Sequence, residues 1–279
     1  MDFEIRKYWR IIAIAAGIAL VFAIIAFAIN LRNRKVNLSK NILEETGKIK
    51  ESKSADWWLN SGGIMDVGDN DNIFSTNIGN LPKNSKWQKL YAKNNPTDTD
   101  GGYKPQNIFR LVNRNKYQDF SQSFYFYINK INLSDSKNRN ESNGILLFNR
   151  YQDGDNLYYA GLRVDGYFVV KKKIDEKYYT MDEKSFLTSG KKYSRNSNAN
   201  FIPVKTWIGI KSEVKNTDDE TVEIKLYVDW EQKGDWQLVL ETTDSGDAYG
   251  DNPFLDEGYA GIRTDFMDVE FKNYNAQEL

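Results

Sequence analysis

The sequence predicts an all-β protein, an antiparallel two-sheet jelly-roll sandwich preceded by one N-terminal transmembrane helix. Beyond Asp56, short segments alternate apolar and polar residues, turn residues separate these segments, and no helical pattern continues. Before that point, Ile11–Ile29 is an unbroken apolar run. With 40% hydrophobic and 14% aromatic residues among 279, the chain can fill a sizeable core.

The apolar run Ile11–Ile29 has the length of a membrane anchor. About 19 residues at about 1.5 Å each span roughly the 30 Å hydrocarbon core of a bilayer. A cleaved signal peptide is the alternative, but its apolar part has only about 7–15 residues and a small-residue cleavage site should follow it. We therefore expect a short N-terminal tail, an anchor, a polar stalk and a jelly-roll domain, at residues 1–10, 11–30, 31–55 and 56–279.

Flanking charge does not decide the orientation, because both flanks of the run are basic. Large domains cross membranes largely regardless of such charge. We expect a single-pass protein of the cell membrane, with the C-terminal domain outside the cytoplasm.

Composition excludes several kinds of chemistry. The chain has no cysteine and no histidine, so a disulfide framework, a cysteine-ligated zinc site and histidine acid–base catalysis are all ruled out. Residues 56–279 hold 28 Lys and Arg against 34 Asp and Glu. An acidic domain of this kind does not predict a nucleic-acid surface.

The segment from Asn143 to Lys173 predicts three strands and two turns. The second turn, Asp165-Gly166, suits a two-residue type I′ hairpin. This turn would pair Val164 with Tyr167, Leu162 with Val169, and Ala160 with Lys171. The apolar face, which we expect to be inward, carries Leu162, Val164 and Val169. The outward face would then carry Tyr159, Arg163, Phe168 and Lys172.

Other segments support the same architecture. In Ser123–Asn129, Phe124, Phe126 and Ile128 point one way, and Tyr125 and Tyr127 the other. The polar region from Asn70 to Asn107 is predicted to be a long loop. Ten to twelve strands are expected in all.

The order of these signals resembles the concanavalin A-like lectin/glucanase superfamily, in particular its laminin-G-like jelly-roll branch. The resemblance covers most of residues 56–279. It is carried by the strand with Arg150, the YYAGLRVDG hairpin, Pro203 four residues before Trp207, the KLYVD strand followed by Trp236, and the closing GYAGIRTDFMDVEF. It implies a concave face that holds glycans and, often, a structural calcium ion.

The candidate ligand is a glycan, because sugar rings pack on Tyr or Trp while their hydroxyls need polar neighbours. Open-face tyrosines could equally pack against loops. The basic side chains would favour acidic sugars. The candidate ligand-binding residues are Tyr125, Tyr127, Arg150, Tyr159, Arg163 and Lys172.

The sequence gives weaker signals for catalysis and metal binding than for glycan binding. In Asp265-Phe-Met-Asp268-Val-Glu270, Phe266 takes the position of the first carboxylate of a retaining glucanase, so we assign no catalytic residue. Lyases of the superfamily use a histidine, although a tyrosine-only scheme remains open. By the resemblance, Asp268 is the candidate calcium ligand. The alternatives to a non-catalytic lectin-like domain are an anchored polysaccharide hydrolase or lyase and a structural module of the cell envelope.

Overall fold

The computed structural model describes residues 42–68, 73–188, 190–217 and 220–279. The expected membrane segment Ile11–Ile29 lies outside them. Within the described residues, no helix has both the length and the apolar character needed to cross a bilayer.

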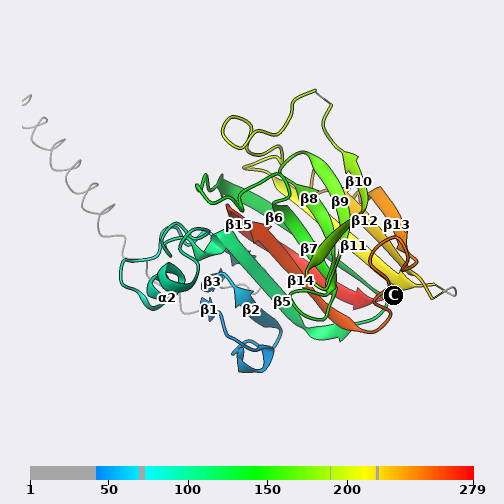
Figure 1. The fold of residues 1–279 in the computed structure, drawn as a ribbon, viewed down its shortest axis with the longest axis horizontal. Helices are drawn as coiled ribbons and strands as arrows, with labels where there is room; N and C mark the ends of the chain where they lie inside the picture. The colour runs from blue at the N-terminus through cyan, green and yellow to red at the C-terminus, as the bar shows by residue number, and fades with distance from the viewer. Residues whose placement is uncertain (1–41, 69–72, 189, 218–219) are drawn as a thin grey trace, which may run out of the picture. The chain divides into compact units, whose positions relative to one another are not determined.

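Two stacked antiparallel sheets form the protein body, as predicted (Figure 1). In spatial order, the eight-stranded sheet contains β1 (Ile42–Glu44), β3 (Ile64–Val67), β4 (Ile73–Ser75), β15 (Met267–Glu278), β6 (Phe120–Ile131), β11 (Trp207–Asn216), β12 (Val222–Asp229) and β13 (Gln237–Asp244). The seven-stranded sheet contains β10 (Lys177–Ser185), β9 (Tyr167–Ile174), β8 (Leu157–Arg163), β7 (Gly144–Tyr151), β14 (Gly258–Asp265), β5 (Ile108–Tyr117) and β2 (Trp57–Ser61).

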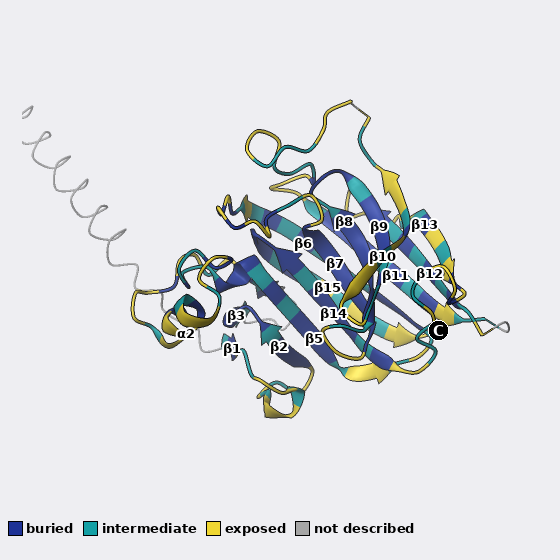
Figure 2. Ribbon diagram, in the orientation of Figure 1, coloured by how far each residue is buried: buried dark blue, intermediate teal, exposed yellow. Residues whose placement is uncertain are grey.

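The main core lies between the sheets and follows the period-two pattern of the strands. Phe124, Phe126 and Ile128 of β6 are fully buried, whereas Tyr125 and Tyr127 lie on the outer face of the same strand. Figure 2 shows this burial along the central strands, with more exposed residues on the edge strands β10 and β13. Each sheet therefore turns one face to the core and one face outward, and a smaller hydrophobic cluster covers part of the outer face of the seven-stranded sheet.

The β8–β9 hairpin differs by one residue from the predicted register. Leu162 pairs with Phe168, and Ala160 pairs with Val170. The turn is longer than expected: Gly166 N–H donates to Arg163 O (3.1 Å), and Gly166 alone of the two turn residues takes a positive φ, 89°. This geometry matches a type I turn closed by a left-handed glycine.

The shift exchanges the faces of β9, because a slip of one residue moves every side chain to the other side. Leu162 and Val164 point inward as predicted. Val169 instead lies on the outer face, and Phe168 and Lys172 lie between the sheets. Lys171 takes the outward position that the predicted register gave to Lys172.

The body begins earlier than residue 56. β1 lies within the stretch expected as a stalk, yet it pairs with β3. The 3-10 helix η1 (Ile49–Glu51) follows, and Trp58 Nε1–H donates to Thr46 O (2.9 Å). Residues from Ile42 onward are therefore part of the sandwich.

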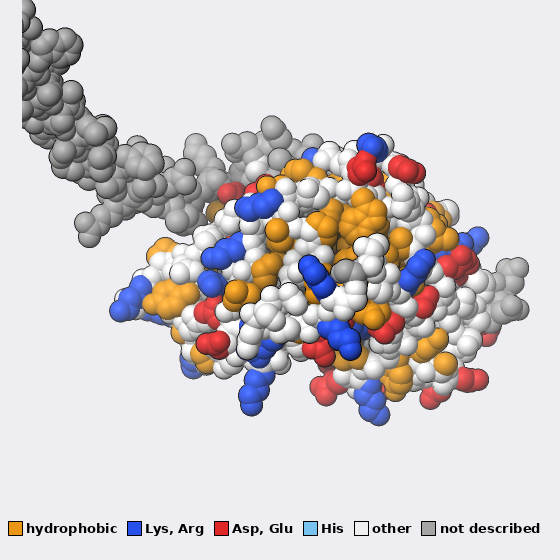
Figure 3. Space-filling view, turned by 90° about the horizontal axis from the view of Figure 1, so that it is seen from above, with side chains coloured by type: hydrophobic (Ala, Val, Ile, Leu, Met, Phe, Trp, Pro, Cys, Tyr) orange, Lys and Arg blue, Asp and Glu red, His pale blue; other side chains and the backbone are white. Residues whose placement is uncertain are grey.

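The region from Asn70 to Asn107 contains more structure than the predicted loop. Besides β4, it holds α2 (Lys86–Asn94) and the 3-10 helix η2 (Pro105–Asn107). Ser85 caps α2 by accepting a hydrogen bond from Gln88 N (3.4 Å), and Trp87 and Tyr91 are buried. On the face drawn in Figure 3, acidic and basic side chains are interspersed around hydrophobic patches.

Candidate functional site

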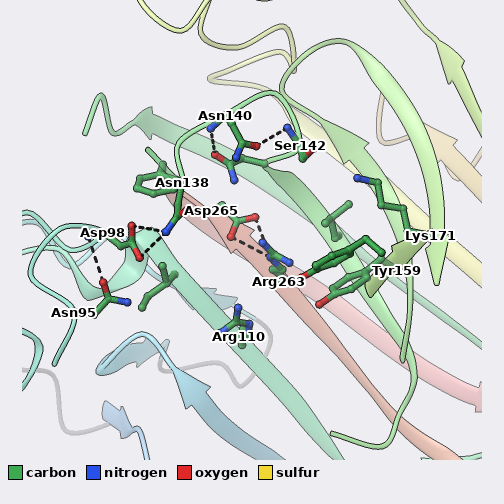
Figure 4. A pocket seen from close by; sticks show the side chains of 15 residues that line it. Asn95, Asp98, Arg110, Asn138, Asn140, Ser142, Tyr159, Lys171, Arg263 and Asp265 are labelled. Atoms are coloured by element: carbon green, nitrogen blue, oxygen red, sulfur yellow. Dashed lines mark hydrogen bonds and ion pairs between the residues drawn. The ribbon is translucent and has the colours of Figure 1, made fainter. Parts of the chain in front are cut away.

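A cavity of about 490 Å³ lies on the outer face of the seven-stranded sheet (Figure 4). Its floor comes from side chains of the central strands, and its walls come from two loops. The floor residues are Ile108, Arg110, Leu146, Tyr159, Lys171, Tyr178, Arg263 and Asp265, with Phe266 following; the loop residues are Asn95, Asp98, Asn138, Asn140, Ser142 and Asn143. We call this cavity the sheet pocket.

Strand register brings the floor residues together. Arg263 of β14 lies between Arg110 of β5 on one side and Leu146 of β7 on the other. Tyr159 of β8 pairs with Lys171 of β9. Their chain neighbours, such as Leu111, Ile262 and Val170, fill the core instead, so the alternation of each strand aims the floor side chains into the pocket.

The walls are rich in amides whose positions are set by local hydrogen bonds. Asn140 N–H donates to Asn143 Oδ1 (2.8 Å), and Ser142 N–H donates to Asn140 Oδ1 (2.9 Å). Asn95 Oδ1 accepts from Asp98 N–H (3.3 Å). Within the described residues, the side-chain NH₂ groups of Asn95, Asn140 and Asn143 donate to nothing. The walls therefore offer fixed donors to a ligand.

The two carboxylates in the pocket are already engaged by the protein. Asp265 accepts from Arg263 Nε with both oxygens, each at 3.0 Å. Asp98 accepts from Asn138 Nδ2 (3.1 and 3.2 Å) and from the Ser136 hydroxyl. A glycoside hydrolase needs a nucleophile or base and an acid that are free to reach the scissile bond, and this pair shows no such freedom.

Aromatic rings form one end of the pocket. Tyr159 is 3% exposed and Tyr178 is 52% exposed, and their rings stack with centroids 6.0 Å apart. Arg263 lies over the Tyr159 ring at 5.4 Å. Tyr178 thus leaves about half of its surface open to solvent beside a buried partner ring.

The electrostatic environment shifts several pKa values. Burial raises the pKa of Tyr159 to about 12. Burial also acts on Tyr178, but the charges of Arg263 and Lys173 outweigh it and lower the pKa of Tyr178. Burial, followed by the charges of Arg163 and Arg263, lowers the pKa of Lys171.

The residues predicted from sequence are divided between the two sheets. Tyr159 lines the sheet pocket. Arg163 shares its strand and face, but it pairs with Asp165 and with Glu183 Oε2 (2.8 Å) and does not line the pocket.

Tyr125 and Tyr127 lie on the outer face of the eight-stranded sheet. Tyr125 packs against Trp236 and donates to Asp229 Oδ2 (2.9 Å), while Tyr127 packs against Trp207. We call these four rings the second aromatic face.

Lys172 was predicted at the surface but is fully buried between the sheets. Its Nζ lies 2.8 Å from Asp244 Oδ2 and donates to Asp251 O (2.6 Å) and Asn252 O (3.0 Å). The one-residue register shift explains the error. Lys172 joins the sheets and holds the β13–β14 connection, and it is not accessible to a ligand.

Arg150 was also predicted to join the ligand surface, and this too is corrected. It is fully buried at the end of β7 with φ 49°. Its guanidinium donates to Gln118 O (2.9 Å), Asn216 Oδ1 (2.6 Å) and Asp119 Oδ1 (3.2 Å). These contacts tie strand ends and loops together and leave the guanidinium unavailable to a glycan.

Asp268, the candidate calcium ligand, lies among amides. Its Oδ1 accepts from Gln106 Nε2 (3.1 Å) and Asn132 Nδ2 (2.9 Å). The same nitrogens donate to Gly79 O (3.1 Å) and Asn107 Oδ1 (3.0 Å). Within the described residues, no three His, Cys, Asp or Glu side chains gather as a metal site, and the buried amide oxygens of Gln106 and Asn132 have no partner.

These orphaned oxygens test whether the cluster fits a metal. The nitrogen and oxygen of an amide can exchange places by a flip. With both amides turned, their oxygens would take the places of the nitrogens, in a row with Gly79 O, Asp268 Oδ1 and Asn107 Oδ1. Neighbouring oxygens in this row would lie 2.9–3.1 Å apart, which is close to the spacing of roughly 3 Å between oxygens bound to one Ca²⁺.

Of the pocket residues, only Tyr159 was predicted to bind ligand, and the most important ones missed on the floor are Arg110, Lys171, Tyr178 and Arg263. Lys171 would have followed from the correct hairpin register. Arg263 lies in the GYAGIRTDF segment, whose facing depends on pairing with β5 and β7. Those pairings join residues more than a hundred positions apart, which no local pattern reveals.

No family model matches the chain, and no curated protein matches it. Among solved structures, it is similar to the carbohydrate-binding module CBM66 from Bacillus subtilis, with 16% identity, 62% of this chain and 83% of that chain covered, and a TM-score of 0.42. It is also similar to the Ca²⁺-bound exoplasmic/lumenal domain of VIP36 (10% identity, 86% and 90% covered, TM-score 0.41). A third is the GH43 protein BlXynB from Bacillus licheniformis (12% identity, 77% and 38% covered, TM-score 0.38).

Proposed function

We propose that this protein is a lectin-like domain of the concanavalin A-like jelly-roll class and that its sheet pocket binds a glycan. The observation that carries the proposal is the Tyr159–Tyr178 stack, with one ring buried and the other open beside free amide donors. An exposed ring next to fixed donors and acceptors suits a sugar, which is apolar on its faces and polar at its edges.

A glycan array with the full chain, followed by titration calorimetry on the best ligand, tests the proposal. Tyr178→Ala should weaken binding about tenfold, because it removes the exposed ring but leaves the core intact. Trp207→Ala on the second aromatic face is the matched control and should bind as the parent does. Loss of binding in Trp207→Ala alone would move the site to the other sheet.

A lyase acting on acidic polysaccharides is the second candidate. The opposite pKa shifts of Tyr159 and Tyr178 favour it, because such a pair can divide the roles of acid and base. Elimination creates an unsaturated sugar that absorbs in the ultraviolet. Product formation that Tyr178→Phe abolishes, with binding retained, would establish the lyase, whereas binding without product supports the lectin-like function.

For calcium, we propose that Asp268, Gln106, Asn132 and Asn107 hold the ion with amides turned from their present orientation. Ca²⁺ at 100 times its Kd should stabilise the fold by about 2.7 kcal/mol. Thermal unfolding with Ca²⁺, with Mg²⁺ and with a chelator measures this effect. Asp268→Asn should remove the dependence on Ca²⁺, and a parent whose melting point ignores Ca²⁺ would refute the site.

We further propose that Ile11–Ile29 anchors the domain at the cell membrane, with the pocket outside the cytoplasm. Protease added to intact cells should then digest the C-terminal domain. A module that contacts another envelope protein remains the third candidate, and it would be favoured if no glycan on the array is retained.

A further inference from the structure

Three cationic side chains line the floor of the sheet pocket. Arg110 and Arg263 lie directly opposite each other on the neighbouring strands β5 and β14. Lys171 lies on β9, three strands beyond β14 in the sheet order. At about 4.8 Å per strand, the backbone of Lys171 is roughly 14 Å from that of Arg263, and the long side chains bring their charges close enough to interact. We call these three side chains the cation row.

Only one member of the cation row has an acidic partner. Arg263 is held by Asp265. Within the described residues, Arg110 and Lys171 make neither a hydrogen bond nor an ion pair with another side chain. The row therefore has two cations without an ion-paired acid.

Cations next to the row on β8 and β9 are paired with acids. Arg163 contacts Asp165 and Glu183, and Lys173 contacts Asp155 Oδ1 (2.6 Å). Among the described residues, Lys177 and Lys184 of the edge strand β10 have no ion pair either, so what distinguishes Arg110 and Lys171 is that they are unpaired and line the cavity.

This arrangement is unfavourable for the empty fold. Like charges directly opposite each other on neighbouring strands repel, and Arg110 faces Arg263 in this way. Lys171 is half-buried, and burial with the charges of Arg163 and Arg263 outweighs the opposing charges of Asp165 and Glu183, so its pKa is lowered and its neutral form is favoured. An anion in the pocket would relieve both costs.

We propose that the sheet pocket recognises an acidic glycan, with one anionic group bound by Arg110 and another by Lys171. This inference rests on the glycan-binding function proposed above. Arg110 can bind a carboxylate or a sulfate through two parallel N–H donors, and Lys171 binds either as a point charge. The separation of the two cations across the sheet fits a chain that carries repeated charges.

A glycan suits the pocket better than another polyanion. Nucleic acids bind broad basic surfaces, whereas residues 56–279 hold 28 Lys and Arg against 34 Asp and Glu. The Tyr178 ring and the amide walls supply contacts for a sugar between the two charged positions.

The test titrates the full chain with polygalacturonate oligosaccharides, their carboxyl-reduced neutral forms, dextran sulfate and a single-stranded oligonucleotide. Arg110→Gln and Lys171→Gln should each weaken binding to the acidic glycan about 10- to 100-fold and leave binding to neutral forms unchanged. The control is Lys215→Gln, which removes one positive charge from an exposed position on the eight-stranded sheet. It should change binding to neither the acidic nor the neutral glycan. The carboxylated and sulfated probes identify the anion.

The same variants give a readout of folding. Because Arg110 and Lys171 have no partner to lose, both variants should melt at or above the parent temperature. The folded-state pKa of Lys171 lies below that of the unfolded chain, so its protonated form opposes folding at neutral pH. The parent should therefore gain stability relative to Lys171→Gln as the pH rises toward 10.5, the ordinary lysine value.

The outcomes separate this inference from the proposed function. Glycan binding that Tyr178→Ala weakens but Arg110→Gln and Lys171→Gln leave intact would overturn the acidic ligand and keep the lectin-like pocket. No retention of any glycan would overturn both. Equal binding of the oligonucleotide, lost in the same variants, would show a general polyanion site and overturn the glycan.

Discussion

At the scale of single residues, the main lesson comes from two adjacent lysines. Lys171 lines the pocket and Lys172 is buried against Asp244, so one position separates a ligand contact from a core ion pair. The sequence correctly placed Tyr159 outward because its apolar neighbours alternate. The sequence could not show which of the two lysines faces outward. Either face of β9 can hold a long cationic side chain if an acid or a ligand lies near it.

Replacing Lys172 measures this buried pair. Lys172→Met should destabilise the fold by about 3–5 kcal/mol, because it leaves Asp244 as an uncompensated charge between the sheets. Adding Asp244→Asn should restore part of that loss, since the amide keeps an acceptor for the Tyr158 hydroxyl (now 2.6 Å away) without the charge. Chemical denaturation of the single and double variants measures the loss of stability and its partial recovery. Equal stability of parent and Lys172→Met would disprove the role of the pair.

At the scale of elements, period-two patterns predicted the strands well and the turns less well. β6, β11 and β12 alternate cleanly, so their inward residues followed directly from the sequence. The turn after β8 contains Asp-Gly, which fits a two-residue loop and a three-residue loop equally, and only the pairing of the whole strands decides between them. α2 escaped detection because its nine residues are mostly polar.

Gly166 is expected to hold the observed register. Its φ is 89°, and an added Cβ would meet the side chain of Leu187. Gly166→Ala should therefore lower the free energy of unfolding by about 1–2 kcal/mol because of the backbone conformation. The loss should be larger if the Leu187 side chain cannot move away from the new methyl group. Thermal unfolding measures this loss. Gly154→Ala, in a turn with open space around it, is the control and should change stability little.

At the scale of the whole molecule, the sandwich separates two aromatic surfaces that the sequence had merged into one. Tyr125 and Tyr127 belong to the eight-stranded sheet, and Tyr159 belongs to the seven-stranded sheet. Strand alternation shows which residues face outward, but assignment of a strand to a sheet depends on long-range pairing. The class of fold was therefore predictable from sequence, whereas the gathering of Arg110, Lys171, Tyr178 and Arg263 with Tyr159 was not.

A crystal structure of the full chain with a bound acidic oligosaccharide tests the central claim most directly. We expect a sugar ring on Tyr178 and anionic groups at Arg110 and Lys171, within the pocket of Figure 4. A saccharide lying across Trp207 and Tyr127 on the opposite outer face, with the sheet pocket filled only by solvent, would contradict it.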